Sequence, residues 1–209
     1  MPFEVLDLGL IGFRAAQTRQ KEIFAAVKGG RLFSALILCQ HHPVISLSRR
    51  ASSANILLSQ AELAVRGIEI CAAERGGDVT YHGPGQIMAY PVFNLNYAKK
   101  DIHYFLRKLE DVVINLLADF DIQAGRYAGL TGVWVGKQKI SSVGIAIRNW
   151  ITFQGLALNV KSDDLDNFRF IRPCGMDIEV TCMEQVKGTK ISAAKVKENL
   201  ITQFKNIFN

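Results

Sequence analysis

The sequence predicts an α+β domain in which a mixed or antiparallel sheet is flanked by helices. Helical and strand-like segments are interspersed without the regular βαβ alternation that is typical of a doubly wound parallel sheet. With 49% apolar and 21% charged residues, the chain of 209 residues can bury a core, which excludes a disordered or collagen-like protein. Its length fits one domain, so we expect a single domain over residues 1–209.

The first half of the chain predicts two helices and several short strands. Apolar residues at helical spacing predict a helix over 12–28 that Gly29 and Gly30 would end. Ser59 and Glu62 form a capping-box pattern for a short helix that ends near Gly67. Strands are predicted at 34–39, 43–47, 68–71 and 87–95, the last of them interrupted at Pro91.

The second half predicts a long helix, an antiparallel meander and a closing helix. Asp101 can cap a helix whose apolar residues recur at helical spacing until about Phe120, and we interpret it as core scaffold. Residues 163–190 are mixed, and 192–208 predict an amphipathic helix. The meander strands are predicted at 132–135, 139–147 and 151–160.

Charge and cysteine content limit the class of protein. Lys and Arg outnumber Asp and Glu by 25 to 19, so the net charge of +6 favours anionic partners. The chain has no run of five basic residues, which argues against nucleic acid, and no apolar run near the ~20 residues of a membrane helix. The four cysteines lack CxxC or zinc-finger spacing, so we expect no metal site and a reducing, cytoplasmic location without an organelle leader.

The segment from Arg75 to Gln86, with the sequence RGGDVTYHGPGQ, concentrates glycine and polar side chains between two apolar stretches. Glycine lets backbone amides approach a ligand, and Arg, Thr, Tyr and His supply hydrogen bonds or charge, so the segment indicates a binding loop. A tight hairpin with incidental polarity fits the composition equally well. The segment matches neither the phosphate-binding GxxxxGK[ST] pattern nor the dinucleotide-binding GxGxxG pattern.

Among the reactive side chains, Cys174 stands between Pro173 and Gly175 in a polar segment, where a thiol can be held rigid and exposed. A free cysteine is more often a small buried apolar residue, an interpretation that is stronger for Cys39 and Cys71 in apolar runs and open for Cys182.

Other polar candidates are weaker. Lys137 in a predicted turn is expected to be solvated, whereas Lys139 at the start of a strand stays ambiguous. His41 and His42 fit capping or buried polar side chains more readily than catalysts, and His103 is expected on the surface.

Taken together, these segments resemble one enzyme family over most of the chain. The shared elements, in order, are His41-x-Pro43-Val44, the Arg75–Gln86 segment, Gly132-Val-Trp-Val135, Lys139-Ile140, Ser142-Val-Gly144, Gly155-Leu-Ala-Leu-Asn159 and Pro173-Cys-Gly175. They are similar to those of the lipoyl(octanoyl) transferases, the octanoyltransferases that begin lipoate synthesis. The resemblance implies the fold of biotin and lipoate protein ligase catalytic domains.

The resemblance also implies an activity and its partners. The family moves an octanoyl group from acyl carrier protein to a lysine on lipoyl domains of 2-oxo-acid dehydrogenases and on the glycine-cleavage H protein, without a cofactor. By resemblance, Cys174 is the acyl-thioester nucleophile and Lys139 lowers its pKa or takes its proton. The implied substrate-binding residues are Arg75, Gly76, Gly77, Asp78, Val79, Thr80, Tyr81, His82, Ser142, Val143, Gly144, Gly155, Leu156 and Ala157. We expect a monomer.

One position departs from the family and two rival functions remain. Where many members carry His before Gly-Leu-Ala-Leu-Asn, this chain has Gln154, whose neutral amide cannot titrate. A lipoate or biotin protein ligase would share the fold but activate a free acid with ATP, and would have no use for Pro173-Cys-Gly175. A non-enzymatic acyl-binding module would tolerate replacement of Cys174 by Ser.

Because acyl carrier proteins are acidic, the net charge of +6 suggests electrostatic steering of this protein toward the donor.

Overall fold

A six-stranded sheet forms the centre of the molecule in the computed structural model, which describes residues 2–208 with the exception of the Cys174 side chain. The strand order in this large sheet is β1-β2-β6-β9-β8-β7. β1 pairs with β2 in parallel and every other neighbouring pair is antiparallel, so the predicted mixed α+β architecture is confirmed. The strands are β1 (Glu4–Ile11), β2 (Ala35–His41), β6 (Gln86–Val92), β7 (Val133–Val135), β8 (Gln138–Arg148) and β9 (Ile151–Asn159).

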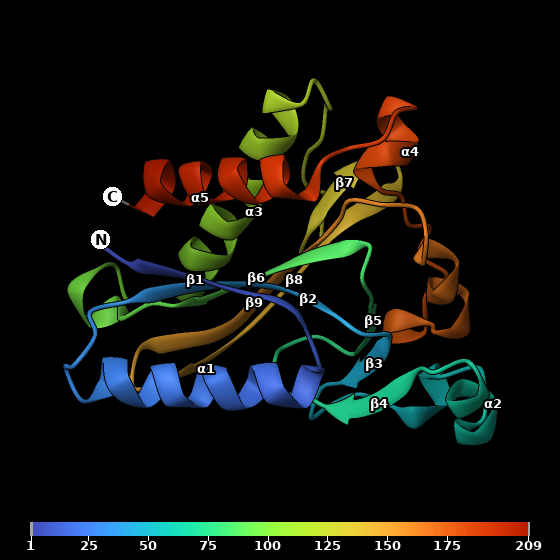
Figure 1. Cartoon of the computed structure of the whole chain (residues 1–209), viewed down its shortest axis with the longest axis horizontal. Helices are drawn as coiled ribbons and strands as arrows, with labels where there is room; N and C mark the ends of the chain where they lie inside the picture. Colours follow the sequence, from blue (N-terminus) through green and yellow to red (C-terminus); the bar gives the residue numbers. More distant parts are fainter. Residues whose placement is uncertain (1, 209) are drawn as a thin grey trace.

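Helices cover both faces of the large sheet (Figure 1). α3 (Ile102–Asp119) and α5 (Ala193–Phe208) pack on one face, where their buried apolar residues meet Leu36, Leu38 and Leu156. α1 (Phe13–Lys28) covers the opposite face through Ile23 and Val27. The alternation of Leu36 and Leu38 with Ile37 and Cys39 between the two cores is what a strand buried on both faces requires.

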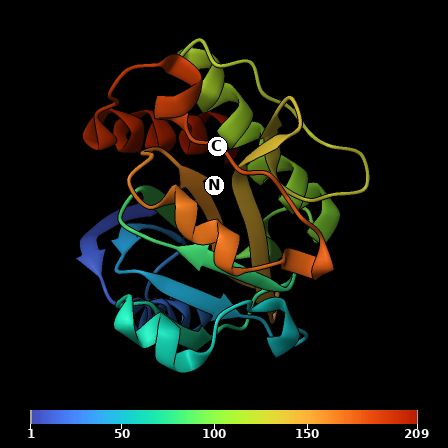
Figure 2. The ribbon, with the colours of Figure 1, turned by 90° about the vertical axis from the view of Figure 1, so that its right-hand side faces the viewer.

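A second, small sheet lies at one end of the large sheet (Figures 1 and 2). Its order is β4-β3-β5, with β3 (Val44–Leu47) parallel to β4 (Glu69–Ala72) and antiparallel to β5 (Val79–His82). Ile45 and Tyr81 from this sheet pack with Leu63 of α2 (Gln60–Val65) and with Phe170. The short helices η1 (Ser53–Asn55), η2 (Leu95–Tyr97), η3 (Leu165–Phe170), η4 (Pro173–Gly175) and α4 (Met183–Lys187) complete the chain.

Most predicted elements are confirmed within a residue or two. Gly29 caps the end of α1, and the side chain of Asp101 accepts the hydrogen bond of the Tyr104 amide at the start of α3. The capping box of α2 is complete, because Ser59 and Glu62 bond each other's backbone amides. The meander β7-β8-β9 and the closing helix α5 are also present where they are predicted.

The structure adds one strand that the sequence does not predict and corrects two predictions about strands. β1 is not predicted from the sequence, because Gly9 takes a positive φ of 61° at a bulge that breaks the alternation. β5 lies inside the segment that we predict as a loop, and its four residues are all buried. β6 continues through Pro91, because its pairing with β9 ends at Ala89 and leaves space for the proline ring beside Gly155.

Candidate active site

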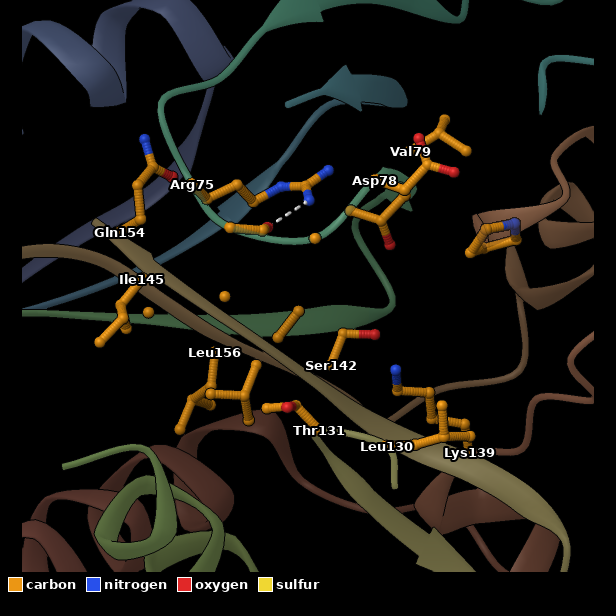
Figure 3. A pocket seen from close by; sticks show the side chains of 18 of the residues that line it. Arg75, Asp78, Val79, Leu130, Thr131, Lys139, Ser142, Ile145, Gln154 and Leu156 are labelled. Carbon is orange, nitrogen blue, oxygen red and sulfur yellow. Dashed lines mark hydrogen bonds between the residues drawn. The ribbon is translucent and has the colours of Figure 1, made fainter. Parts of the chain in front are cut away.

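A cavity of about 430 Å³ opens between β8, β9 and the segment that follows β4. This volume lies within the ~300–1,000 Å³ range of small-molecule sites. Figure 3 shows the cavity with Arg75 and Asp78 above the strands and with Lys139 at one end. The predicted residues that line it are Arg75, Gly76, Gly77, Asp78, Val79, Thr80, His82, Lys139, Ser142, Val143, Gly144, Gly155, Leu156 and Ala157.

Tyr81 is the predicted substrate-binding residue that does not line this cavity. Its ring packs in the core of the small sheet, on the face of β5 opposite to Thr80 and His82, which line the cavity. The Tyr81 hydroxyl donates to Asp164 at 3.3 Å and accepts from Asn167 at 2.9 Å. Tyr81 therefore holds the η3 segment and does not contact the cavity.

Lys139 enters the cavity from the start of β8. Its Nζ lies 5.0 Å from the centre of the Trp134 ring, a cation–π contact that holds the side chain on the strand β7 side. Gly132 leaves the room that this lysine needs, because a Cβ at that position would come within 2.8 Å of Lys139 Cε. The backbone of Gly132 also takes a φ of 131°, which L side chains rarely adopt.

The backbone of Lys139 clamps the segment that follows η4. The Lys139 amide donates to the Glu179 carbonyl at 2.8 Å, and the Thr181 amide donates to the Lys139 carbonyl at 3.0 Å. Together they form a parallel bridge between Lys139 and Val180. Two segments that are distant in the sequence are thus joined beside the cavity.

Cys174 belongs to η4, and its side chain lies outside the described part of the structure. Its neighbours Pro173 and Met176 line the same cavity as Lys139. Gly175 takes a φ of 69°, a turn that glycine favours. The nucleophilic role of Cys174 therefore stays a prediction, in a segment whose flanking residues border the cavity.

A set of hydrogen bonds begins at Arg75 in the cavity wall and leads into the protein interior. The Arg75 guanidinium donates from Nη2 to the carbonyl and the hydroxyl of Ser46, at 2.7 and 2.9 Å. Ser46 Oγ lies 3.3 Å from His82 Nε2, and His82 Nδ1 lies 3.0 Å from Gln86 Oε1. Gln86 must accept with Oε1, because its Nε2 donates elsewhere, so His82 carries its proton on Nδ1 and accepts from Ser46 through Nε2.

The same network continues to the segment beside Lys139. Gln86 Nε2 donates to Asn159 Oδ1 at 3.0 Å, and Asn159 Nδ2 donates to the Thr181 carbonyl at 2.9 Å. The Thr181 amide in turn donates to the Lys139 carbonyl. Every amide in this chain of bonds has a fixed orientation, which fixes how β5, β6, β9 and the 177–181 segment meet.

Burial keeps both histidines near the cavity neutral. The pKa of His82 falls to about 3, first because the ring is buried and also because His41 and Arg75 lie nearby. Burial likewise lowers the pKa of His41 to about 4; its Nδ1 lies 2.9 Å from the Ile11 carbonyl and its Nε2 2.7 Å from the Tyr90 hydroxyl. His41 is a buried polar side chain, as the sequence favours, and His42 is exposed.

The glycines of the Arg75–Gln86 segment serve two purposes. Gly76 lines the cavity and donates its amide to the Ile145 carbonyl at 3.0 Å, so the segment crosses β8 closely. Gly83 and Gly85 instead face Asp164, whose carboxylate would lie 1.6 Å from a Cβ at Gly83 and 2.4 Å from one at Gly85. The second pair of glycines therefore packs against the chain itself.

The sequence does not identify several residues that line the cavity. Ile102 and Leu106 come from the first turns of α3, which is predicted only as scaffold, although their four-residue spacing places them on one helix face. Leu130 and Thr131 precede β7. Gln154, which the sequence singles out only as a departure from the family, also lines the cavity; it is 4% exposed and takes a φ of 60°.

The remaining cysteines are buried apolar residues. Cys39 and Cys71 are 0% and 1% exposed, and Cys182, which the sequence leaves open, is 0% exposed. Lys137 is exposed, as predicted.

In the described range 2–208, no three His, Cys, Asp or Glu side chains gather as a metal site would require. Nor is any helix in that range long and apolar enough to cross a membrane.

Comparisons of the sequence with known proteins show the family of this chain. The family model of the lipoyl protein ligase A/B catalytic domain matches residues 14–205. An octanoyltransferase of Thermoanaerobacter sp. (strain X514) is 44% identical over 207 residues, which cover 98% of this chain and 90% of that protein. An octanoyltransferase of Solibacter usitatus is 41% identical over 203 residues, which cover 97% of this chain and 91% of the relative.

Solved structures share the fold at much lower identity. A bi-partite lipoate protein ligase from Thermoplasma acidophilum superposes with a TM-score of 0.77 at 18% identity, covering 100% of this chain and 84% of that chain. The biotin protein ligase of Aquifex aeolicus, in complex with biotin and ATP, superposes with a TM-score of 0.61 at 10% identity, covering 98% of this chain and 69% of that one. At these identities the structures support the fold alone.

Proposed function

Because the chain belongs to the lipoyl protein ligase A/B catalytic-domain family, we propose that it is an octanoyltransferase acting in protein lipoylation. In this reaction an octanoyl group passes from octanoyl-acyl carrier protein to a lysine of a lipoyl domain. The proposed acceptors are the lipoyl domains of 2-oxo-acid dehydrogenases and the glycine-cleavage H protein. The relatives named as octanoyltransferases match over nearly the whole chain, which supports octanoyl as the transferred group. The net charge of +6 supports an acidic protein as the donor.

The observation that carries the proposal is a cavity with a lysine at one end and an apolar interior. Lys139 stands where the segment that follows η4 is bridged to β8, and Val143, Leu156 and Ala157 line the cavity further along the strands. An acyl chain is apolar, so burying it along these residues stabilises the bound state by removing its methylene groups from water. A reactive acyl carbon would then lie near the lysine end.

We propose that Cys174 carries the acyl group between donor and acceptor. Its thiolate would attack the thioester carbon of the donor, pass through a tetrahedral oxyanion, and expel the donor's thiolate, which takes up a proton. The neutral amine of the acceptor lysine would then attack the new thioester, forming an amide and expelling the Cys174 thiolate, while the proton that the amine nitrogen loses is taken up by that thiolate or by solvent. Exchange of one thioester for another is nearly neutral in free energy and amide formation is downhill, so no ATP is needed.

Lys139 is the proposed partner of that thiol. A free thiol with a pKa of ~8.5 is only a few per cent thiolate at neutral pH, and a nearby ammonium raises this fraction. Pro173 and Met176, on either side of Cys174, line the cavity that Lys139 enters, which supports this pairing. The clamp between Lys139 and the 179–181 backbone would hold the two segments in register.

Transfer without ATP is the experiment that tests the function. Octanoyl-acyl carrier protein and an unmodified lipoyl domain are incubated with the protein and apyrase, and the lipoyl domain is weighed by mass spectrometry. The proposal expects octanoyl on one lysine of the acceptor. Modification that appears only with free octanoate and ATP would instead identify a ligase, and binding of octanoyl donor with no transfer would identify a binding module.

A further inference from the structure

Glu110 is a buried carboxylate on α3 that the proposed reaction does not use. Its side chain is 0% exposed, and charged side chains are almost never fully buried without partners. Arg107 Nη1 and Arg126 Nε both donate to Glu110 Oε2 at 2.7 Å. The Gly132 amide donates to Glu110 Oε1 at 3.0 Å. One carboxylate on α3 therefore holds two points of the segment that leads to β7.

These two points are the ends of a loop, 126–132, that forms part of the cavity wall. Arg126 begins the loop and Gly132 ends it directly before β7. The loop residues that line the cavity are Gly129, Leu130 and Thr131. Figure 3 shows Leu130 and Thr131 at the same end of the cavity as Lys139. Glu110 thus fixes both ends of the wall at the end where the proposed chemistry takes place.

The same segment contacts the side chain of Lys139. Gly132 lies so close that a Cβ there would come within 2.8 Å of Lys139 Cε, and the Lys139 ammonium lies over the Trp134 ring. Trp134 in turn exchanges two backbone hydrogen bonds with Gly125, at 2.8 and 2.9 Å, just before the loop. Two contacts of the Lys139 side chain therefore depend on the position of the segment that Glu110 holds.

We propose that Glu110 is a positioning residue, which holds the 126–132 loop and through it places Lys139 for the reaction. This inference rests on the proposed function. A carboxylate suits this role because both of its oxygens accept hydrogen bonds, so one group can serve two guanidinium groups and a backbone amide.

The substitution Glu110→Gln releases one end of the loop in either orientation of the new amide. If the glutamine oxygen accepts from the Gly132 amide, its NH₂ group faces the donors of Arg107 and Arg126. If the amide is turned round, the buried Gly132 amide loses its acceptor. The size and shape of the side chain stay the same in both cases.

Alkylation of Cys174 by iodoacetamide at pH 7 tests the inference, because its rate follows the thiolate fraction that a nearby ammonium sustains. Peptide mass spectrometry assigns the label to Cys174. We expect Glu110→Gln to slow this reaction about threefold or more, and to lower kcat/KM for octanoyl transfer about tenfold. In a Lys139→Met background, Glu110→Gln should not slow alkylation further, because its effect passes through Lys139.

Asp111→Asn is the matched control. The exposed Asp111 accepts from Arg126 Nη2 at 2.6 Å, so this variant changes the same arginine but leaves the carboxylate of Glu110 and its donors in place. Its alkylation rate should stay within about twofold of the unsubstituted protein. Arg126→Gln, at a partly exposed residue, releases the other end of the loop and should also slow alkylation, which keeps the test decisive if Glu110→Gln does not fold.

An unchanged rate in folded Glu110→Gln or folded Arg126→Gln, with Lys139→Met slowed, would overturn the inference and leave the proposed function intact. Equal slowing in Asp111→Asn, or further slowing by Glu110→Gln in the Lys139→Met background, would also overturn it. An unchanged rate in Lys139→Met would remove the proposed pairing with Cys174 and the inference with it. If the unsubstituted protein transfers no octanoyl group, the proposed function fails, and the alkylation rates still show whether Glu110 acts through Lys139.

Discussion

The Arg75–Gln86 segment contains two pairs of glycines, Gly76 with Gly77 and Gly83 with Gly85, which have different structural roles. Gly76 and Gly77 line the cavity, and a Cβ at Gly77 would make only an ordinary contact, 3.5 Å from the Arg75 guanidinium. Gly83 and Gly85 have no room for a Cβ, because Asp164 fills that space. Glycine enrichment thus indicates close approach of a backbone, but whether the approaching group is a ligand or the protein itself depends on the fold.

The largest loss of stability is expected from a substitution in the second glycine pair, Gly83 and Gly85. Gly83→Ala would place a Cβ 1.6 Å from Asp164 Oδ2 and 2.5 Å from the Tyr81 hydroxyl, both of them held by hydrogen bonds. We expect a loss of about 3 kcal/mol or more in the free energy of unfolding, measured by urea denaturation.

The double variant Gly83→Ala with Asp164→Ala is the control for this steric cause. Removing the carboxylate should recover part of the lost stability, so the two substitutions should be strongly non-additive. Additive losses would mean that Gly83 does not pack against Asp164.

The next-largest expected effect is the pH dependence of stability that comes from His82, the residue directly before Gly83. Its folded pKa of about 3 lies below the unfolded value near 6.5, so the unfolded chain binds the proton first. The contribution of neutral His82 is fully present above pH 6.5 and is lost as the pH falls toward 3. At pH 4 this loss amounts to about 3 kcal/mol, an order-of-magnitude value.

Urea denaturation between pH 7 and pH 4 checks this dependence. His82→Gln removes the titrating ring, so its free energy of unfolding should fall less steeply over the same range, with His41 continuing to titrate. Equal slopes in both proteins would show that His82 is not held neutral by the fold.

Arg75 precedes the first pair and should affect activity more than stability. It binds Ser46 through Nε and Nη2, and an ammonium cannot reproduce that planar geometry. We expect Arg75→Lys to lower kcat/KM for octanoyl transfer about tenfold, because the cavity segment loses its anchor. Arg49→Lys, at an exposed arginine paired with Glu74, is the matched control and should leave kcat/KM unchanged.

The smallest effect is expected at the first glycine pair. Gly77 has a φ of 85°, so Gly77→Ala costs about 1 kcal/mol of backbone strain, without a clash to add to it. Thermal denaturation should therefore show a much smaller loss than for Gly83→Ala. A loss as large as that of Gly83→Ala would remove the distinction between the two pairs.

The local patterns predict the helices better than the strands. The spacing of apolar residues in α3 and the capping signals at Ser59 and Asp101 are properties of neighbouring residues, and the structure confirms them. The conformation of β5 depends on pairing with β3, a partner more than thirty positions away, so its polar sequence indicates a loop. Pro91 is tolerated because of Gly155 on another strand, which no local pattern reveals.

The residues of the candidate site also fall into those that the sequence indicates and those that depend on tertiary packing. Residue types alone indicate the Arg75–Gln86 segment as a binding loop, but Lys139, the cavity residues of β8 and β9 and the role of Cys174 come from the family resemblance. Ile102 of α3 is missed, and Gln154 is noted only as a departure from the family, because the direction of a side chain toward a cavity is set by tertiary packing. The network through Gln86 and Asn159 joins three strands and cannot be read from spacing alone.

The most direct measurement of the central claim is the location of the acyl adduct. The protein is incubated with octanoyl-acyl carrier protein without ATP, quenched in acid, digested and mapped by peptide mass spectrometry. We predict octanoyl on Cys174, a weaker label at neutral pH in Lys139→Met, and a full label in Lys137→Met, whose lysine is exposed in the adjacent turn. Octanoyl on Cys39, Cys71 or Cys182, or a label that requires ATP, would contradict a thioester intermediate at Cys174.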